Sequence, residues 1–225
     1  LVRSNRRGVT LYVFFVRLLA LFLVIYSGFC LLWGVFFFGD SFAEKAGLCE
    51  DKISVEQLKE VTAYFANLAN EYSQKVNRND EGFYSCDKGA ILDKSVEVYR
   101  PVEKLFPVLK GDEHKVKSLI FSRALSYFDF TGFFFPFTAE ANVSVDFPSG
   151  DFAATVAHEI SHQRGVAKEQ ESNFVAVVAC LEYGDADFVY SASLLAYTHL
   201  GNALYSVSPE DWEEIYSSLG EPVLK

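Results

Sequence analysis

Residues 155–165 read TVAHEISHQRG and contain the pattern His-Glu-x-x-His at His158, Glu159 and His162. On a helix, side chains four positions apart point to the same side, one turn above the other. The two imidazoles can therefore hold one metal ion between them, while Glu159 lies where a general base for a water molecule belongs. The pattern predicts a helix that carries a zinc site for hydrolysis, with Zn2+ as the cofactor.

The residues around this pattern are apolar, which favours a buried helix over a solvated one. A buried helix with two histidines and a glutamate needs partners for these polar groups. A bound metal ion supplies them, and the alternative is a pair of core histidines satisfied by hydrogen bonds. Only four histidines occur in the chain, and two of them have the metal-binding spacing, which favours the metal. The apolar neighbours are Ala153, Ala154, Val156, Ala157 and Ile160.

A third metal ligand is expected just after this helix. Gly165 is placed to end the helix, because a C-terminal glycine adopts the left-handed conformation that reverses the chain. Residues 169–181 then form a second helix-length run, which begins with two acids, Glu169 and Glu171. Glu169 shares a helical face with small and polar side chains, which suits close approach of two helices, whereas Glu171 shares a face with bulky ones. We expect Glu169 as the third ligand, with Glu171 as the alternative.

The run HEISHQRGVAKEQESNF at residues 158–174 resembles a bacterial membrane family called domain of unknown function 3810. The stretches 32–48 and 136–142 are similar to it as well. The resemblance implies a membrane-anchored, zincin-like metallopeptidase of the gluzincin type, in which a glutamate is the third zinc ligand. The gluzincin pattern Glu-x-x-Ala-Asp takes that ligand from its first glutamate, and residues 169–173 read EQESN, which supports Glu169. Family members usually carry membrane sequence before this region and a tail after it, which suggests that the chain is a fragment.

Residues 18–38 form an uncharged, almost wholly apolar run of 21 residues, with Arg17 at its edge. At a rise of about 1.5 Å per residue, a helix of this length spans the roughly 30 Å hydrocarbon core of a bilayer. A buried core helix and a signal peptide are the alternatives, but the run is long for a signal and no small-residue cleavage site follows Gly39. We therefore expect a transmembrane helix within residues 1–39.

Charge gives the expected orientation of this helix. Four arginines and no acid precede residue 18, whereas the rest of the chain has 16 basic and 30 acidic residues, a balance of −14. Basic residues favour the cytoplasmic side, so we expect the N-terminus in the cytoplasm and residues 40–225 as one zincin-like domain outside the membrane. The acidic balance argues against nucleic acid as a partner, because phosphate binding needs a basic patch.

The remaining sequence predicts a mostly α fold of the α+β class. Ser54 and Gln57 have the spacing of a capping box that begins a helix, and Pro101 and Pro107 are expected to break or bend another. Alternation at residues 141–146 predicts a short strand or hairpin just before the metal-binding helix. The other expected helices cover residues 54–76, 90–109, 188–205 and a short stretch after Ser208.

The predicted strand contains Asn142, Val143 and Ser144 and leads directly to the metal-binding helix. A free edge here would pair with an extended peptide and hold the scissile bond over the metal. An ordinary hairpin that covers the core is the alternative. Glu140, at the start of the strand, is either a substrate-binding or a structural acid.

Two cysteines and the two remaining histidines are expected to lie outside the metal site. Cys49 and Cys86 fall in polar, loop-like settings and form either a disulfide in an oxidising compartment or two free thiols. His114 lies in a charged turn that is expected to be solvated. His199 lies among leucines of a predicted helix, which indicates a packing residue outside the metal site.

These features together predict a membrane-anchored zinc metallopeptidase that acts on a peptide or protein substrate, with no oligomeric state favoured. His158, His162 and Glu169 hold the metal, while Glu159 takes a proton from water and passes it to the leaving amine. Asn173, one turn from Glu169, is expected to orient a ligand imidazole. The alternative is a catalytically silent domain of the same fold that senses a ligand or partner at the membrane.

Overall fold

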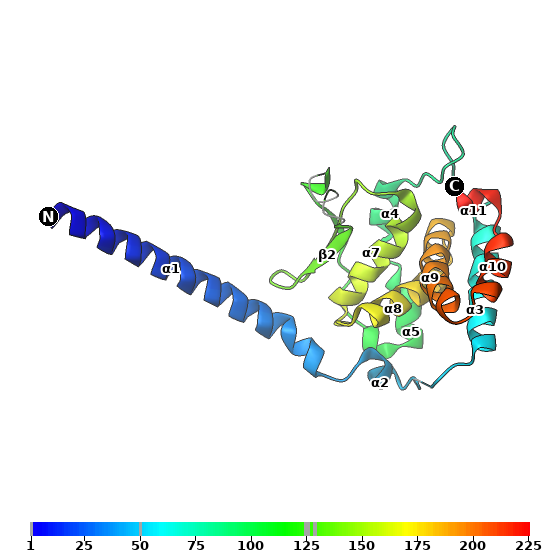
Figure 1. Ribbon diagram of the computed structural model, residues 1–225, viewed down its shortest axis with the longest axis horizontal. Helices are drawn as coiled ribbons and strands as arrows, with labels where there is room; N and C mark the ends of the chain where they lie inside the picture. The colour runs from blue at the N-terminus through cyan, green and yellow to red at the C-terminus, as the bar shows by residue number, and fades with distance from the viewer. Residues whose placement is uncertain (1, 50, 124–126, 128–129) are drawn as a thin grey trace.

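Helix α7 (Ser149–Gln163), which carries the His-Glu-x-x-His pattern, lies inside the folded domain in the computed structural model of the protein (Figure 1). It packs against helices α8 (Glu169–Tyr183) and α9 (Ala186–Val207) and against a small sheet. The structure describes residues 2–49, 51–123, 127 and 130–225. Across these residues the chain is mostly helical, as the sequence predicts.

The other helices precede the domain or build the frame around α7. Helix α1 (Val2–Leu32) is followed by the 3₁₀ helix η1 (Gly34–Phe38) and projects from the domain. Helices α3 and α10 pack beside α9, so α9 separates them from the metal-binding pattern. The remaining helical elements are α2 (Phe42–Ala46), α3 (Val55–Tyr72), α4 (Lys88–Lys94), α5 (Tyr99–Leu105), η2 (Pro107–Leu109), α10 (Pro209–Ser217) and α11 (Glu221–Leu224).

The buried face of α7 fixes this helix in the core. Phe152, Val156 and Ile160 recur every four positions on α7 and are almost completely buried. Burying side chains of this size stabilises the fold by about 1.5–3 kcal/mol each. From α5, the hydroxyl of Tyr99 donates a hydrogen bond of 2.7 Å to the carbonyl of Ala157. The histidines of α7 are therefore carried by a helix that is held on several sides.

The sheet has three strands in the order β1-β3-β2. β3 (Glu140–Val143) pairs in parallel with β1 (Lys117–Ser118) and antiparallel with β2 (Gly132–Phe135). The hairpin expected before α7 is therefore present, formed by β2 and β3. Among the described residues, no strand pairs with the outer edge of β2.

The expectation that residues 142–144 offer a free strand edge is wrong. Asn142 and Val143 lie in β3, between β1 and β2, so both edges of this strand are occupied. Both side chains and that of Ser144 are buried. Glu140, at the other end of β3, forms an ion pair with Lys117 of β1, which is a structural role.

The turn after α7 follows the prediction made for Gly165. This glycine has a φ of +82°, in the left-handed region that favours glycine. Its N–H donates to the carbonyl of His162, and the N–H of Val166 donates to that of Ser161, both at 3.0 Å. These two bonds end α7 and turn the chain back, so that α8 begins beside the histidines.

Helix α1 contains one stretch, Val9–Leu32, that is long and apolar enough to cross a membrane. The expected span, residues 18–38, differs at both ends, since the helix begins earlier and ends at Leu32. Trp33 leaves the helical conformation, and its ring packs against Phe134 of β2 with 4.9 Å between ring centroids. This contact accounts for the chain turning into η1, although the apolar run continues.

Most of the expected scaffold helices are confirmed, although α3 ends at Tyr72 and not near residue 76. In α3, the N–H of Gln57 donates to Ser54 Oγ at 3.2 Å and the N–H of Ser54 donates to Gln57 Oε1 at 2.8 Å, which is the predicted capping box. Helices α9 and α10 match the predictions for residues 188–205 and for the stretch after Ser208.

The helical stretch expected over residues 90–109, broken or bent at Pro101 and Pro107, forms α4, α5 and η2. The break lies between Lys94 and Tyr99, and Pro101 falls inside the first turn of α5. A proline is tolerated in a first turn, where its missing N–H would have no helical partner. Pro107 does mark a boundary, since it begins η2.

Cys49 and Cys86 are free thiols in the structure, which is the second of the two alternatives. Burial raises the pKa of the Cys86 thiol, so this side chain is a poor nucleophile. His114 is exposed, as expected for a residue in a charged turn.

Candidate metal centre

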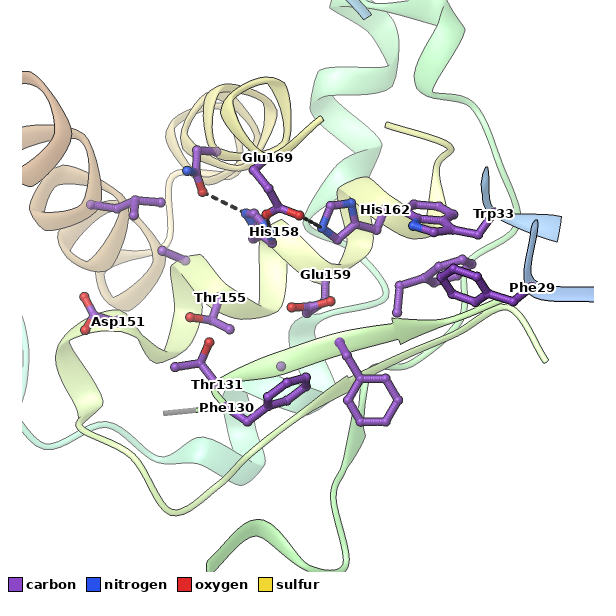
Figure 2. A pocket seen from close by; sticks show the side chains of 16 residues that line it. Phe29, Trp33, Phe130, Thr131, Asp151, Thr155, His158, Glu159, His162 and Glu169 are labelled. Atoms are coloured by element: carbon purple, nitrogen blue, oxygen red, sulfur yellow. Dashed lines mark hydrogen bonds and ion pairs between the residues drawn. The ribbon is translucent and has the colours of Figure 1, made fainter. Parts of the chain in front are cut away.

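The three ligand side chains expected from the sequence meet where α7 and α8 join (Figure 2). His158 and His162 project from α7 with 4.7 Å between their ring centroids, and Glu169 faces both from the first turn of α8. Glu169 Oε2 lies 3.1 Å from His158 Nε2, and Glu169 Oε1 lies 3.6 Å from His162 Nε2. Two ligand atoms at about 2.1 Å from a tetrahedral zinc ion are about 3.4 Å apart, so these separations suit such an ion.

The second nitrogen of each imidazole is bound to the protein. His162 Nδ1 lies 2.7 Å from the carbonyl of Val166, which only accepts, so Nδ1 carries the proton and donates. His158 Nδ1 donates in the same way to Asn173 Oδ1 at 2.8 Å. Both Nε2 lone pairs therefore point toward the carboxylate of Glu169. Two Nε2 lone pairs and a carboxylate that face one another have no proton to share, and a cation between them would satisfy all three. These groups therefore fit a zinc ion.

Burial favours the neutral, metal-binding form of these imidazoles. Burial, and after it the neighbouring His162, lowers the pKa of His158. A histidine with a lowered pKa stays neutral at pH 7, as a metal ligand must. Glu169, by contrast, is 71% exposed and closes the site on the solvent side.

Asn173 connects two histidines that lie on different helices. Its Oδ1 accepts from His158, which is the contact with a ligand imidazole expected from the sequence. Its Nδ2 lies 3.3 Å from Nε2 of His199 on α9. His199 lies outside the group of three candidate ligands, as expected, but its side chain is exposed and contacts Asn173, so the expectation of a packing residue among leucines is wrong.

Glu159 points from α7 toward β2 and is 4% exposed (Figure 2). Its Oε2 has no hydrogen-bond partner among the described residues. Burial, and after it the charge of Glu169, raises the pKa of Glu159 to about 8. Burying a carboxyl group without hydrogen-bond partners destabilises the fold, and such groups are typical of catalytic or binding sites.

The room for Glu159 depends on Gly132 of β2. A Cβ atom added at Gly132 would lie 2.6 Å from Glu159 Oε1 and 3.0 Å from the carbonyl oxygen of Asn142. A side chain at this position would force Glu159 to move, so glycine is what allows this close approach. No local sequence pattern marks Gly132 as a site residue, because only its pairing with β3 places it over α7.

Glu171, the alternative third ligand, is engaged elsewhere. Its Oε2 accepts from the N–H of Phe42 at 3.0 Å, and its Oε1 accepts from the N–H of Ala43 at 3.2 Å. These are the first two residues of α2, so the carboxylate caps that helix and ties it to α8. Of the two acids, only Glu169 faces the histidines.

The three ligands lie at one side of a cavity of about 590 Å³, within the usual range for a small-ligand site. One side, which we call the polar wall, comes from α7 and the start of α8. The other side, which we call the aromatic wall, comes from the end of α1 and from residues 130–134. The polar wall contains Asp151, Thr155, His158, Glu159, His162, Glu169 and Asn173, and the aromatic wall contains Phe29, Trp33, Phe130, Phe133 and Phe134.

The aromatic wall is in direct contact with a metal-ligand candidate. The ring of Trp33 lies edge-on to His162, with 5.5 Å between centroids and planes at 89°, beside Phe29 in Figure 2. Neither Trp33 nor Phe29 was predicted from the sequence as a site residue. Their only signal is aromatic and apolar character, which also fits a membrane span.

The fold and the site define a mostly helical protein with an apolar N-terminal helix and a candidate metal centre on two adjacent helices. The family described as "Protein of unknown function (DUF3810)" matches residues 1–225, and the chain belongs to it. No curated protein and no solved structure matches the chain.

Proposed function

We propose that the protein is a membrane-anchored zinc metallopeptidase with a zincin-like domain of the gluzincin type. One observation carries this proposal: a ligand atom from each of His158, His162 and Glu169 lies within 4.8 Å of the others, beside a buried Glu159 whose Oε2 has no hydrogen-bond partner in the described part of the chain. Two imidazoles and a carboxylate match the three protein ligands of catalytic zinc sites, which leave a fourth position open.

The residues around the site divide the work of hydrolysis. A zinc ion bound here would supply a Lewis acid that polarises a carbonyl group and lowers the pKa of water. Glu159 is placed to accept a proton from the attacking water and to donate it to the leaving amine. Its raised pKa favours exchange of a proton near neutral pH. Asn173 and the Val166 carbonyl hold the imidazoles with Nε2 toward the metal.

The substrate we propose is an extended peptide bound along β2. The outer edge of β2 has no partner strand among the described residues, and its Gly132 lies against Glu159. A peptide that pairs with this edge would place its backbone over Glu159. The aromatic wall favours apolar side chains on such a peptide, because Phe133 and Phe134 line the cavity at the same strand.

The proposal includes a location for the site. Val9–Leu32 crosses the membrane, with the N-terminus in the cytoplasm and the domain outside. The length and apolar character of this stretch support the first part. The arginines before residue 18 and the acidic balance after it support the second.

The test uses the full chain in detergent micelles, loaded with zinc, and a broad peptide library. We expect one zinc per chain and hydrolysis that Glu159→Gln lowers by about 10² to 10⁴-fold, since a general base contributes that much. The variant should still bind zinc, because Glu159 is not a ligand. Glu60→Gln, at an exposed position of α3, is the matched control and should leave hydrolysis unchanged.

Two results would contradict the proposal. The first is equal hydrolysis by the wild type and Glu159→Gln, because the cleavage would then come from another enzyme. The second is one bound zinc with no cleavage of any peptide by the wild type, which would favour the silent sensor domain.

A further inference from the structure

A ladder of phenylalanine rings runs along the β2–β3 hairpin. Neighbouring ring centroids are 6.0 Å apart from Phe130 to Phe133, 6.4 Å from Phe133 to Phe135 and 5.4 Å from Phe135 to Phe137. Phe130, Phe135 and Phe137 are exposed although they are large and apolar. A contiguous exposed patch of this kind marks a contact surface. We call these four residues the aromatic ladder.

The ladder ends against the membrane-length part of α1. A Cβ atom added at Gly28 would lie 3.0 Å from Phe137 Cε1, so this ring rests on the helix where it has no side chain. Gly28 is four residues before the end of the Val9–Leu32 stretch. At about 1.5 Å per residue, Phe137 therefore meets α1 about 6 Å inside the end of the candidate span.

The hairpin is held in this position by bonds at and beside its turn, residues 136–139. Gln163, the last residue of α7, donates through Nε2 to the carbonyl of Ala139 at 2.8 Å. Glu140 of β3 is paired with Lys117 of β1. The tip is therefore fixed relative to α7 and lies close to α1, as Figure 1 shows.

The composition of the hairpin suits lipid and not water. Residues 130–139 contain no charged side chain and five phenylalanines. The first charge after them, Glu140, is neutralised by Lys117. Aromatic side chains are favoured at the boundary between headgroups and hydrocarbon.

We propose that the aromatic ladder lies in the outer boundary region of the bilayer that α1 crosses, so that the hairpin is a second membrane contact. This inference rests on the proposed membrane span of α1 and not on the metal chemistry. The surface that covers the aromatic ladder is the lipid bilayer, because the last ring of the ladder, Phe137, contacts α1 within its proposed membrane span. The cavity shares Phe130 and Phe133 with the ladder, and Phe29 with α1, so it opens at the membrane surface.

The experiment measures quenching of tryptophan fluorescence by brominated lipids. The full chain with Trp33→Phe and Trp212→Phe, which removes both native tryptophans, is placed in phosphatidylcholine vesicles. Three single reporters are compared, each a phenylalanine changed to tryptophan: Phe137→Trp in the ladder, Phe22→Trp in the middle of α1, and Phe83→Trp. Phe83 is 45% exposed against 42% for Phe137. It follows Gly82, which lies beside the C-terminal Lys225, away from α1 in Figure 1.

With bromines near the ester end of the acyl chains, we expect emission of Phe137→Trp to fall about twofold, as for a ring in the boundary region. Bromines near the chain ends should quench Phe22→Trp more than Phe137→Trp. Phe83→Trp should be unaffected by either lipid. Phe135→Trp is the second reporter if Phe137→Trp does not fold, because the two rings are in contact.

Three outcomes would overturn the inference. If Phe22→Trp is quenched and both hairpin reporters behave like Phe83→Trp, the hairpin is outside the bilayer although α1 crosses it. If Phe22→Trp is not quenched either, α1 is not in the membrane and both proposals about the membrane are wrong. If emission of Phe137→Trp changes with protein dilution and not with brominated lipid, the ladder binds a second copy of the chain.

Discussion

The polar wall and the aromatic wall of the cavity differ in how the chain builds them. The polar wall comes from residues 151–173, two consecutive helices joined by a turn at Gly165. The aromatic wall joins residues 29–33 to residues 130–134, which are far apart in sequence. Hydrogen bonds that the two imidazoles donate to the Val166 carbonyl and to Asn173 Oδ1 orient the first wall, whereas ring contacts hold the second.

This difference separates two tasks that one cavity must perform. The polar wall contains the groups that can bind a metal, and each imidazole has a partner behind it. The aromatic wall and β2 give the cavity its shape and set where Glu159 lies. Substitutions of the candidate ligands in the polar wall and of the groups that hold them should therefore change metal binding, and substitutions in β2 should change hydrolysis while the metal stays.

The largest effect is expected for His162→Ala, which removes a buried candidate ligand. Zinc content should fall from one per chain to almost none, because the cation loses one of three protein ligands. His199→Ala is the matched control: it removes a histidine that contacts Asn173 without facing the metal, so zinc should remain near one per chain. Elemental analysis after dialysis measures both, and zinc retained by His162→Ala would break the account of the polar wall.

The next largest effect is expected for one of the two acids of α8, Glu169, and not for the other, Glu171. Glu169→Ala should weaken zinc binding by more than the roughly 100-fold that loss of an outer-shell partner costs. Glu171→Ala should leave zinc affinity unchanged and lower the free energy of unfolding by about 2 kcal/mol, because it removes a charged acceptor from two N–H groups of α2. Chelator competition and denaturant titration give the two quantities, and the reverse assignment would show that Glu171 is the ligand.

Gly132→Ala tests the wall that contains β2. The added Cβ must displace Glu159, whose Oε1 would otherwise lie 2.6 Å away. A shift of about 1 Å in a catalytic group lowers turnover by about 100-fold, so hydrolysis should fall by that factor while zinc content stays at one per chain. Gly39→Ala, where a Cβ has nothing closer than 3.9 Å, is the control. Loss of zinc in Gly132→Ala would mean that the two walls do not have separate tasks.

The smallest effect is expected for Asn173→Ala. Loss of the hydrogen bond to His158 Nδ1 should weaken zinc binding by about tenfold, because this bond fixes the tautomer and the orientation of the imidazole. Asn202→Ala, at an exposed position of α9, should have no effect. An unchanged zinc affinity in Asn173→Ala would limit its role to packing.

The polar wall was predictable because its geometry is local. His158, Glu159 and His162 follow from helical spacing, and a glycine with a positive φ after them brings Glu169 back to the same place. The choice of Glu169 over Glu171 followed from helix faces. Glu171 binds the N-terminus of α2, which lies about 130 residues earlier in the sequence. No local sequence pattern predicts this contact.

The aromatic wall was not predictable for a related reason. An apolar run from residue 18 to 38 reads as one membrane helix, since hydropathy does not mark where a helix ends inside such a run. The helix ends at Leu32, where Trp33 packs on Phe134, a residue 101 positions later in the chain. The strand before α7 was found, but its neighbours on both sides depend on pairings that alternation alone does not determine.

X-ray absorption at the zinc edge, on the zinc-loaded full chain, tests most directly whether the two histidines and Glu169 form the metal site. The account predicts two imidazole nitrogens and one carboxylate oxygen in the first shell, at about 2.0–2.2 Å, with an additional light ligand in the open position. A sulfur atom at about 2.3 Å, or a shell without imidazole, would contradict it.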